Sequence, residues 1–429
     1  MSMSDDRGQT ESVNIINALR RGTVPGSGLS RLAVGIEVEE GVIARQLGYV
    51  ADGGGDLKFI KGDYGAGKTF LLARTLEIAQ QAGFATAHVV VSSETPLARL
   101  RSVYQRICAN LVTREDEAAF KAVLDSFLYA IEERVLEIRG SDLADDELRE
   151  ETIRSIERSL AELAEGSSAF AAAVRAYYEA NADEDYALAQ AALGWLSGEP
   201  NVGRPFRAKA GVRGTIDETV ALAFLSDLVA VIRGAGYAGL VIALDEAETT
   251  QALPRASREK AYNNLRQLID LLDRGQLAHT YLLVTGTPSL FEGAKGIRSV
   301  PPLADRIGTV GDDGYRNPLQ PQLALARFDA QKLEQVALRV MDIYAEAHGE
   351  VDRERVSHRF IRAQIRQLTG RFGGRVDVIP RLFLREFVDV LDKAALYPEY
   401  DPWTAYRFDP KETDMPLTDE EEAVMVVEW

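Results

Sequence analysis

Residues 62–69 read Gly-Asp-Tyr-Gly-Ala-Gly-Lys-Thr and fit the pattern G-x-x-x-x-G-K-[ST]. The apolar run LKFI at 57–60 precedes them, and the helical run FLLARTLEIAQQAG at 70–83 follows. This order of strand, glycine-rich loop and helix constrains the fold more than any other feature of the chain, because it is the context that such a loop requires. The alternative, a glycine-rich turn with a surface lysine, does not need that context.

The loop has the composition of a phosphate cradle. Its glycines let the backbone N–H groups point inward around an anion, and the following helix adds the positive end of its dipole. We expect ATP to be bound here, with Lys68 on the β and γ phosphates and the Thr69 hydroxyl on Mg²⁺. The expected nucleotide contacts are Gly62, Asp63, Tyr64, Gly65, Ala66, Gly67, Lys68, Thr69 and Phe70.

Two acids follow a second apolar strand, at Leu240–Glu246. Ligands bind at the carboxyl ends of the strands in such sheets, so we expect Asp245 to hold Mg²⁺ and Glu246 to orient and polarise the attacking water. Two acids that merely cap a core strand are the alternative. A kinase would also need an acceptor pocket, and the sequence contains no sign of one.

The next strand candidate, 280–288, ends in Thr285-Gly286-Thr287-Pro288. A polar side chain there can lie between the two motifs and touch the γ-phosphate or the water. Thr287 is the first choice because it lies at the tip, and Thr285 is the second. A turn that only ends the strand is the alternative.

The remaining pattern predicts an α/β fold with a parallel sheet flanked by helices. Further strands are expected at 88–94 and 321–328, and a helical, acidic insertion at about 114–200. The acidic faces of this insertion are most simply solvated surface, with partner binding as the alternative. The expected divisions are an N-terminal arm with an adenine-side loop at 1–50, an ATPase core at 51–328, a helical domain at 329–409 and an acidic tail at 410–429.

Composition excludes several classes of protein. The 429 residues carry a formal charge of −17, which argues against strong binding of nucleic acid over the whole surface but leaves room for a local basic strip. One cysteine, Cys108, permits no intrachain disulfide, and with four histidines a zinc site is not expected. The polar N-terminus and the lack of a run of about 18 apolar residues predict a cytoplasmic protein with no membrane segment.

Arginines concentrate near the C-terminus. Residues 353–385 contain nine arginines, with only Glu354 and Asp377 as acids. If this stretch is helical, Arg355, Arg359, Arg362 and Arg366 share one face, since they are separated by 4, 3 and 4 residues. Such a face needs anions nearby. DNA, the acidic insertion and a neighbouring subunit are the three candidates.

These residues together resemble AAA+ ATPases and, more narrowly, the BREX phage-defence ATP-binding proteins of the BrxD-like family. The resemblance covers about 300 residues and is carried by the stretches at 18–22, 24–25, 33–35, 59–71, 244–248, 285–288, 380–381 and 383–385. The glycine-rich loop at 62–69 (a P-loop) and the Asp245-Glu246 pair occur in many ATPase families. Their combination with the N-terminal stretch points to this family.

The resemblance implies a role in distinguishing phage from host DNA, alongside a methyltransferase and often a helicase. It places Val34 and Gly35 near the adenine and makes residues 329–409 a helical lid domain. In ring-forming ATPases the region of Arg306 presents an arginine to a neighbour's γ-phosphate, so a homo-oligomer is expected, with Arg298 as the alternative finger. A surface Arg306 paired with Asp305 is the opposing interpretation.

A lid arginine at a helix start can sense the γ-phosphate, with Arg381 as first choice and Arg375 as second. Three functions remain open at this point. The first is an ATP-driven switch or motor in a defence complex. The second is a nucleotide-gated scaffold with negligible turnover, and the third is a DNA loader or remodeller that uses the arginine face.

Overall fold

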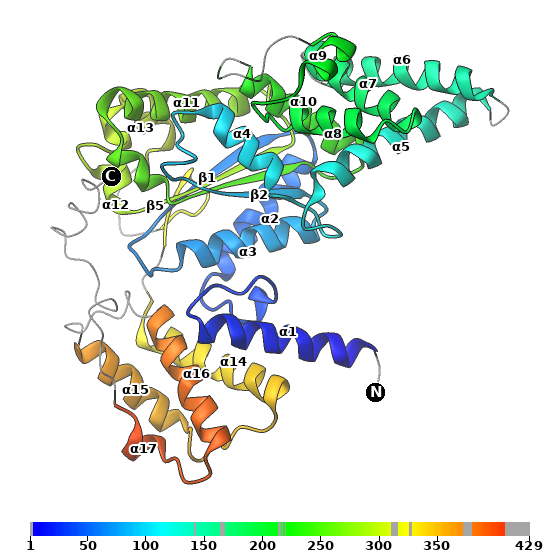
Figure 1. Cartoon of the computed structure of the whole chain (residues 1–429). Helices are drawn as coiled ribbons and strands as arrows, with labels where there is room; N and C mark the ends of the chain where they lie inside the picture. Colours follow the sequence, from blue (N-terminus) through cyan, green and yellow to red (C-terminus); the bar gives the residue numbers. More distant parts are fainter. Residues whose placement is uncertain are drawn as a thin grey trace.

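The computed structural model describes residues 3–140, 143–163, 168–212, 216, 218, 220–309, 316–325, 328–371 and 380–407. Two of the predicted features, Arg375 and the acidic tail 410–429, lie outside these residues. Within them the chain forms a sheet with helices on both faces, a helical arm at one end, and a helical bundle below the sheet in the view of Figure 1.

The sheet has six strands in the order β3-β2-β4-β5-β1-β6. Every neighbouring pair is parallel except β2 and β3, which are antiparallel. The strands are β1 (Gly55–Lys61), β2 (Ala85–Val90), β3 (Leu111–Val112), β4 (Leu240–Asp245), β5 (Thr280–Gly286) and β6 (Gln322–Ala324). The prediction of an α/β fold with a mostly parallel sheet is therefore confirmed. Only β3 was not predicted, because a two-residue strand leaves no periodic pattern.

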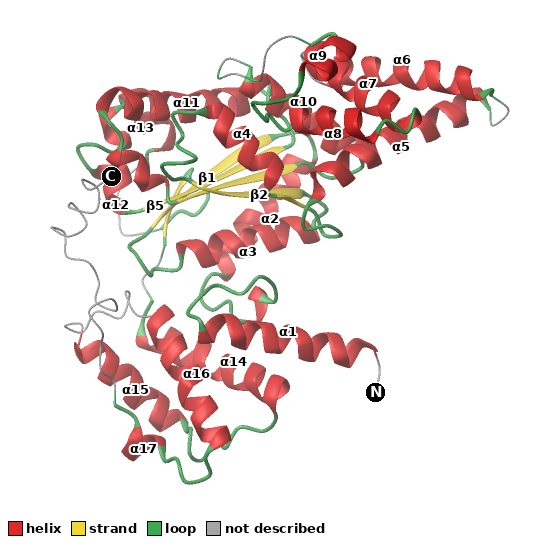
Figure 2. Cartoon of the chain, viewed as in Figure 1, coloured by secondary structure: helices red, strands yellow, loops and turns green. Residues whose placement is uncertain are grey.

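The central strands are apolar on both faces, as a parallel sheet covered on both sides requires. In β1, Phe59 points to one side and Ile60 to the other, and the two belong to different core clusters. Figure 2 shows the two helical layers. One layer contains α2 (Glu37–Ala51) and α3 (Lys68–Gln81); the other contains α4 (Leu100–Ala109), α10 (Ala221–Gly234), α11 (Arg255–Asp273) and α13 (Pro301–Ile307).

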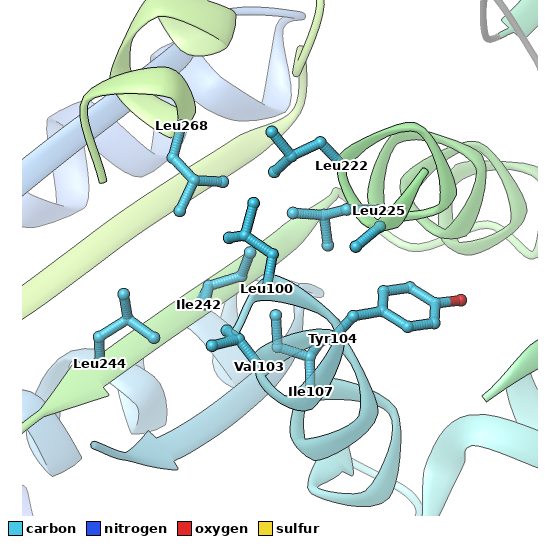
Figure 3. A pocket seen from close by; sticks show the side chains of 10 residues that line it. Leu100, Val103, Tyr104, Ile107, Leu222, Leu225, Ile242, Leu244 and Leu268 are labelled. Atoms are coloured by element: carbon cyan, nitrogen blue, oxygen red, sulfur yellow. The ribbon is translucent and has the colours of Figure 1, made fainter. Parts of the chain in front are cut away.

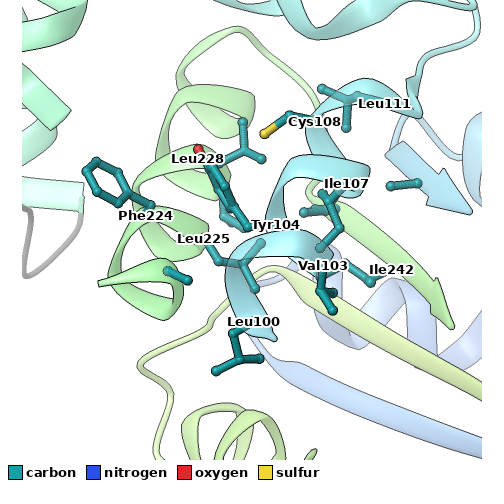
Figure 4. Packing of buried hydrophobic residues seen from close by; sticks show 14 of the residues in the cluster. Leu100, Val103, Tyr104, Ile107, Cys108, Leu111, Phe224, Leu225, Leu228 and Ile242 are labelled. Carbon is teal, nitrogen blue, oxygen red and sulfur yellow. The ribbon is translucent and has the colours of Figure 1, made fainter. Parts of the chain in front are cut away.

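Helices α4 and α10 pack against each other over β4. Leu100 and Val103 of α4 lie between Leu225 of α10 and Ile242 of β4 (Figure 4). A cavity of about 20 Å³ with an apolar lining remains among these side chains (Figure 3). Its volume suits about one water molecule, but its walls offer few polar partners. It is a packing gap rather than a ligand site.

The insertion leaves the sheet at β3 and returns at α10. It comprises α5 (Ala119–Arg139), α6 (Asp145–Leu163), α7 (Ser168–Ala182), α8 (Tyr186–Leu196) and α9 (Arg204–Ala210). Phe224 of α10 anchors it, with ring centroids 5.4 Å from Phe170 and 5.5 Å from Trp195. Its buried residues join the same core cluster as the sheet, so the arm is packed onto the core rather than tethered to it.

A second, separate core lies in the C-terminal bundle, which we define as α1 (Met3–Arg20), α14 (Ala330–His348), α15 (His358–Arg371), α16 (Pro380–Leu396) and α17 (Pro402–Ala405). Ile15, Ile16 and Leu19 insert α1 between α14 and α16. The N-terminal 50 residues are thus divided, because α1 packs in this bundle and α2 packs on the sheet. Asp329 caps α14 by accepting a hydrogen bond from the Lys332 backbone N–H at 2.8 Å. Among the described helices, none combines the length and hydrophobicity that a bilayer crossing requires.

Candidate nucleotide-binding site

The glycine-rich loop joins β1 to α3 in the way the sequence predicts. Gly65 and Gly67 have φ of 78° and 92°, in the region that favours glycine. Gly67 is the residue before the first turn of α3, so Lys68 and Thr69 begin the helix. The loop therefore brings backbone N–H groups and a helix N-terminus together, which is the arrangement that binds phosphate.

Lys68 is folded back onto this loop. Its Nζ donates hydrogen bonds to the carbonyl oxygens of Gly62 at 2.9 Å and Asp63 at 3.1 Å, and it lies 5.0 Å from the centre of the Tyr64 ring. Only 8% of Lys68 is exposed. Burial lowers the pKa of the ammonium, and nearby acids, Glu248 foremost, oppose that shift. A phosphate that entered the loop would give the Lys68 ammonium a charged acceptor in place of these two neutral carbonyl oxygens.

Asp245 is the centre of a hydrogen-bonded group at the end of β4. The Thr285 hydroxyl donates to its Oδ1, as does the Glu246 backbone N–H at 3.0 Å. The Thr69 hydroxyl lies 3.3 Å from its Oδ2. Burial alone would raise the pKa of Asp245, but the nearby His88 ring and the hydrogen bonds from Thr285 and the Glu246 backbone outweigh it and hold the pKa below the usual range. Asp245 is therefore an ionised, oriented oxygen donor.

His88, on β2, was not predicted as a site residue. Its Nε2 lies 3.5 Å from Asp245 Oδ2, which is too long for a strong hydrogen bond but close enough for charge to act. The side chain is 38% exposed. A histidine at an interior strand position carries no sequence signal for this contact, because the pairing of β2 with β4 creates it.

Glu246 turns sharply away from the strand. Its φ of 57° is left-handed, which is uncommon for a residue with a side chain and marks a site where surrounding contacts enforce the backbone. Its N–H also lies 3.2 Å from the Thr285 hydroxyl. The carboxylate is exposed and lines the cleft described below.

The two threonines of β5 occupy different places. Because β5 lies between β1 and β4, its carboxyl end stands between the loop and the acids. Thr285 is the residue that contacts Asp245 there. Thr287, the first choice from sequence, is buried, and its hydroxyl pairs with that of Ser289 at 2.9 Å. The geometry therefore favours Thr285 for the role between the motifs.

A cleft of about 1220 Å³ extends from this edge to the C-terminal bundle. The segment 22–36 forms one wall, including Val34 and Gly35, and Glu77 of α3 anchors that wall by accepting hydrogen bonds from the N–H groups of Gly28 and Leu29 at 2.9 and 3.3 Å. The bundle side includes Leu19, Lys332, Val336, Pro380, Arg381 and Leu384, with Phe328 just before α14. Of these, only Arg381 was predicted from the sequence as a nucleotide contact.

Two cations of the bundle side lie over glycines of that wall. A Cβ on Gly35 would come within 2.7 Å of Lys332 Cε, and one on Gly22 would lie 3.4 Å from Arg381 Nε. Both glycines have left-handed φ, 70° and 68°. The left-handed backbone favours glycine at both positions, whereas the close approach at Gly35 is to the flexible end of the Lys332 side chain, which can move aside.

Arg306 does not face the cleft. Its Nη2 forms an ion pair with Asp270 Oδ1 at 2.7 Å, across α13 and α11, and its Nη1 donates to the Pro302 carbonyl at 2.6 Å. The partner is Asp270 rather than the Asp305 considered from sequence. Arg298 lies in a short 3₁₀ turn, Ile297–Ser299.

The prediction of four arginines on one helix face is wrong for Arg355. Helix α15 begins at His358, and Arg355 lies in the preceding turn, where its guanidinium donates to the carbonyls of Ala394, Tyr397 and Tyr400. The spacing rule fails because the helix starts later than the pattern suggests.

The other three arginines of the predicted face do lie on α15. Arg362 pairs with Glu334 at 2.8 Å, Arg359 lies 5.4 Å from the Trp403 ring, and Arg366 donates to the Arg362 carbonyl at 3.2 Å. In Figure 1, α15 and the acidic arm lie at opposite ends of the molecule, so the two do not dock within one chain.

A mostly parallel sheet with helices on both faces and a glycine-rich loop between β1 and α3 fits the class of P-loop NTPases. Comparison with known families narrows this class. The family model for the BREX system ATP-binding protein BrxC/D matches residues 8–410, and the chain belongs to that family. The family predicted from the sequence is confirmed. Searches of curated proteins and of solved structures find no match.

Proposed function

We propose that this chain is a Mg²⁺-dependent ATPase of the AAA+ type that acts as a switch or motor in BREX phage defence. The observation that carries the proposal is the constellation around Asp245. This acid is ionised, oriented by Thr285 and Thr69, and opens on the same cleft as Lys68 and Glu246. A site that only bound nucleotide would not need an exposed carboxylate held in a left-handed turn beside it.

The residues present fit ATP and Mg²⁺. A carboxylate and a hydroxyl oxygen, from Asp245 and Thr69, are the hard donors that Mg²⁺ accepts alongside phosphate and water. When bound, Mg²⁺ would neutralise charge on the phosphates. Lys68 would exchange its loop carbonyls for the β and γ phosphates. Glu246 would take a proton from the attacking water at its carboxylate.

We infer that the C-terminal bundle is the lid of an AAA+ unit. It faces the phosphate edge across the cleft, and Arg381 reaches the cleft from the first turn of α16. Val34 and Gly35 lie on the wall between them, where an adenine would be enclosed by apolar side chains of both parts. Closing this cleft on ATP would convert nucleotide binding into a movement of the bundle.

We also propose that copies assemble, with Arg306 as a finger toward a neighbour's γ-phosphate. For this role the ion pair with Asp270 must open. That pair favours a second function, a nucleotide-gated scaffold whose isolated subunit turns over slowly. A finger of this kind raises turnover by about 10³–10⁵-fold where it acts, so the two functions differ strongly in their dependence on assembly.

Direct DNA contact is a narrower proposal. Arg355 and Arg362 are engaged by carbonyls and by Glu334, whereas Arg359 and Arg366 make no ion pair among the described residues. We therefore assign any phosphate contact on this face to Arg359 and Arg366. Partners such as the helicase or methyltransferase of a defence system are the alternative occupants.

The test is phosphate release from ATP by the purified protein across a range of concentrations. Turnover that needs Mg²⁺, stops with a chelator and is lost in Glu246→Gln, while ATP binding persists, supports the ATPase. ATP binding without Mg²⁺-dependent turnover at any concentration supports the scaffold instead. Measuring the mass in solution with and without ATP, and then with duplex DNA, shows whether the subunits assemble and whether they bind DNA.

A further inference from the structure

Glu248 is a buried carboxylate in the candidate nucleotide site to which none of the roles above applies. It lies in the short 3₁₀ segment Ala247–Ala252 that follows β4 and Glu246. Only 7% of it is exposed, yet it lines the cleft. Neither carboxylate oxygen has a hydrogen-bond partner among the described residues. A buried acid without a partner is costly, which makes this position a candidate for a role in ligand binding.

Lys68 and Glu248 are both buried and line the same cleft, and Lys68 is the cation that lowers the pKa of Glu248. Burial raises the pKa of Glu248 and the Lys68 ammonium opposes this, while Glu246 and Asp245 add to the rise. In the other direction, Glu248 is the acid that most favours the charged form of Lys68. The ammonium nonetheless donates to the carbonyls of Gly62 and Asp63, so Glu248 attracts Lys68 without holding it in a hydrogen bond.

A γ-phosphate brought to Lys68 would enter the field of this acid. Two anions would then share one cation in a partly desolvated cleft, where charges act more strongly than in water. We propose that Glu248 is a positioning residue that attracts the Lys68 ammonium across the cleft and limits the affinity of the site for the γ-phosphate. ADP lacks that group and is affected less. Glu248 thereby weakens retention of ATP, and of the phosphate released from it.

This inference rests on the proposed function, and one experiment separates the two. Glu246→Gln serves as the parent so that ATP is not consumed, and the dissociation constants of MgATP and MgADP are measured by titration calorimetry. Adding Glu248→Gln, which keeps the shape and removes the charge, should tighten ATP about tenfold and ADP by less than about twofold. Glu248→Asp, which keeps the charge and shortens the side chain, should tighten ATP less than Glu248→Gln does.

The matched control is Glu259→Gln, the same charge removal on the exposed side of α11, where Glu259 pairs with Arg255. It should change neither constant. A parent that fails to bind ATP overturns the proposed function, and this inference with it. A parent that binds ATP, with Glu248→Gln binding no tighter or tightening ATP and ADP equally, overturns this inference alone. Melting temperatures of all variants confirm that each is folded.

Discussion

The phosphate edge of the sheet and the C-terminal bundle face the same cleft but are built in different ways. At the edge, the hydroxyls of Thr285 and Thr69 each donate a hydrogen bond to Asp245. Among the described residues, no hydrogen bond or ion pair joins the bundle to Lys68, Thr69, Asp245 or Glu246; the bundle meets them only across the cleft. The polar group at the edge is thus already formed on the sheet, and the lid movement that we propose for the bundle would not require that group to break.

The largest loss of ATP affinity should come from a substitution at the phosphate edge of the sheet. Lys68→Ala removes the ammonium that would meet the β and γ phosphates, and we expect ATP binding to weaken by at least about 100-fold, or about 2.8 kcal/mol. Lys260→Ala, at an exposed position of α11, is the control and should leave the affinity unchanged. Calorimetric titration measures both. An affinity for ATP within about threefold of wild type would show that the site is elsewhere.

The second largest effect, on turnover, tests which of Thr285 and Thr287 orients Asp245 at the phosphate edge. Thr285→Val removes the hydroxyl that orients Asp245 and leaves one oxygen with one donor fewer, so turnover should fall about tenfold. Thr287→Val, matched in chemistry two residues away, removes only a bond to Ser289 and should cost less than about twofold. Steady-state phosphate release distinguishes them. The reverse order would restore the choice made from sequence.

These threonines show how far sequence could go. The loop at 62–69 and the acid pair at 245–246 are each an uninterrupted run of residues. Each motif can therefore be recognised in the sequence without the structure. Thr285 and Thr287 are both polar residues at a strand end, and only the register of β5 between β4 and β1 decides which reaches Asp245. His88 and Lys332 join the site from strands and helices distant in sequence, and no local pattern marks them.

The same distinction between local pattern and tertiary contact applies to the fold. Apolar runs predicted five of the six strands, the helical pattern predicted α3 and the C-terminal helices, and the excess of helical residues between 97 and 200 predicted the insertion. Packing partners were not predictable. The apolar positions of α1 indicate a buried face, but they do not say that Ile15, Ile16 and Leu19 bury it in a bundle formed more than 300 residues later.

Substitutions on the bundle side of the cleft should reduce ATP affinity less than Lys68→Ala does. Arg381→Ala and Lys332→Ala each remove a partly exposed cation from the cleft, and we expect ATP affinity to fall about fivefold, or about 1 kcal/mol, in each. Adding salt should shrink both effects, because partly exposed charges are screened. Unchanged affinity in both variants would remove the bundle from the nucleotide site.

The smallest effect on nucleotide should come from inside the bundle. Arg20 of α1 makes two hydrogen bonds to the Asp392 carboxylate of α16, at 2.7 and 2.8 Å. Arg20→Ala should lower the free energy of unfolding by about 1 kcal/mol while leaving ATP affinity within about twofold. Denaturant unfolding and calorimetry measure the two quantities. A large loss of ATP affinity would mean that the docking of α1 controls the cleft.

The central claim is that ATP is held between the preassembled edge and the bundle, and hydrogen exchange tests it most directly. The variant Glu246→Gln would be compared with and without MgATP, so that hydrolysis does not intervene. The account predicts slower amide exchange in residues 62–70 and also in 22–36 and 330–340 when ATP is bound. Slowing confined to 62–70, or absent from that loop, would contradict it.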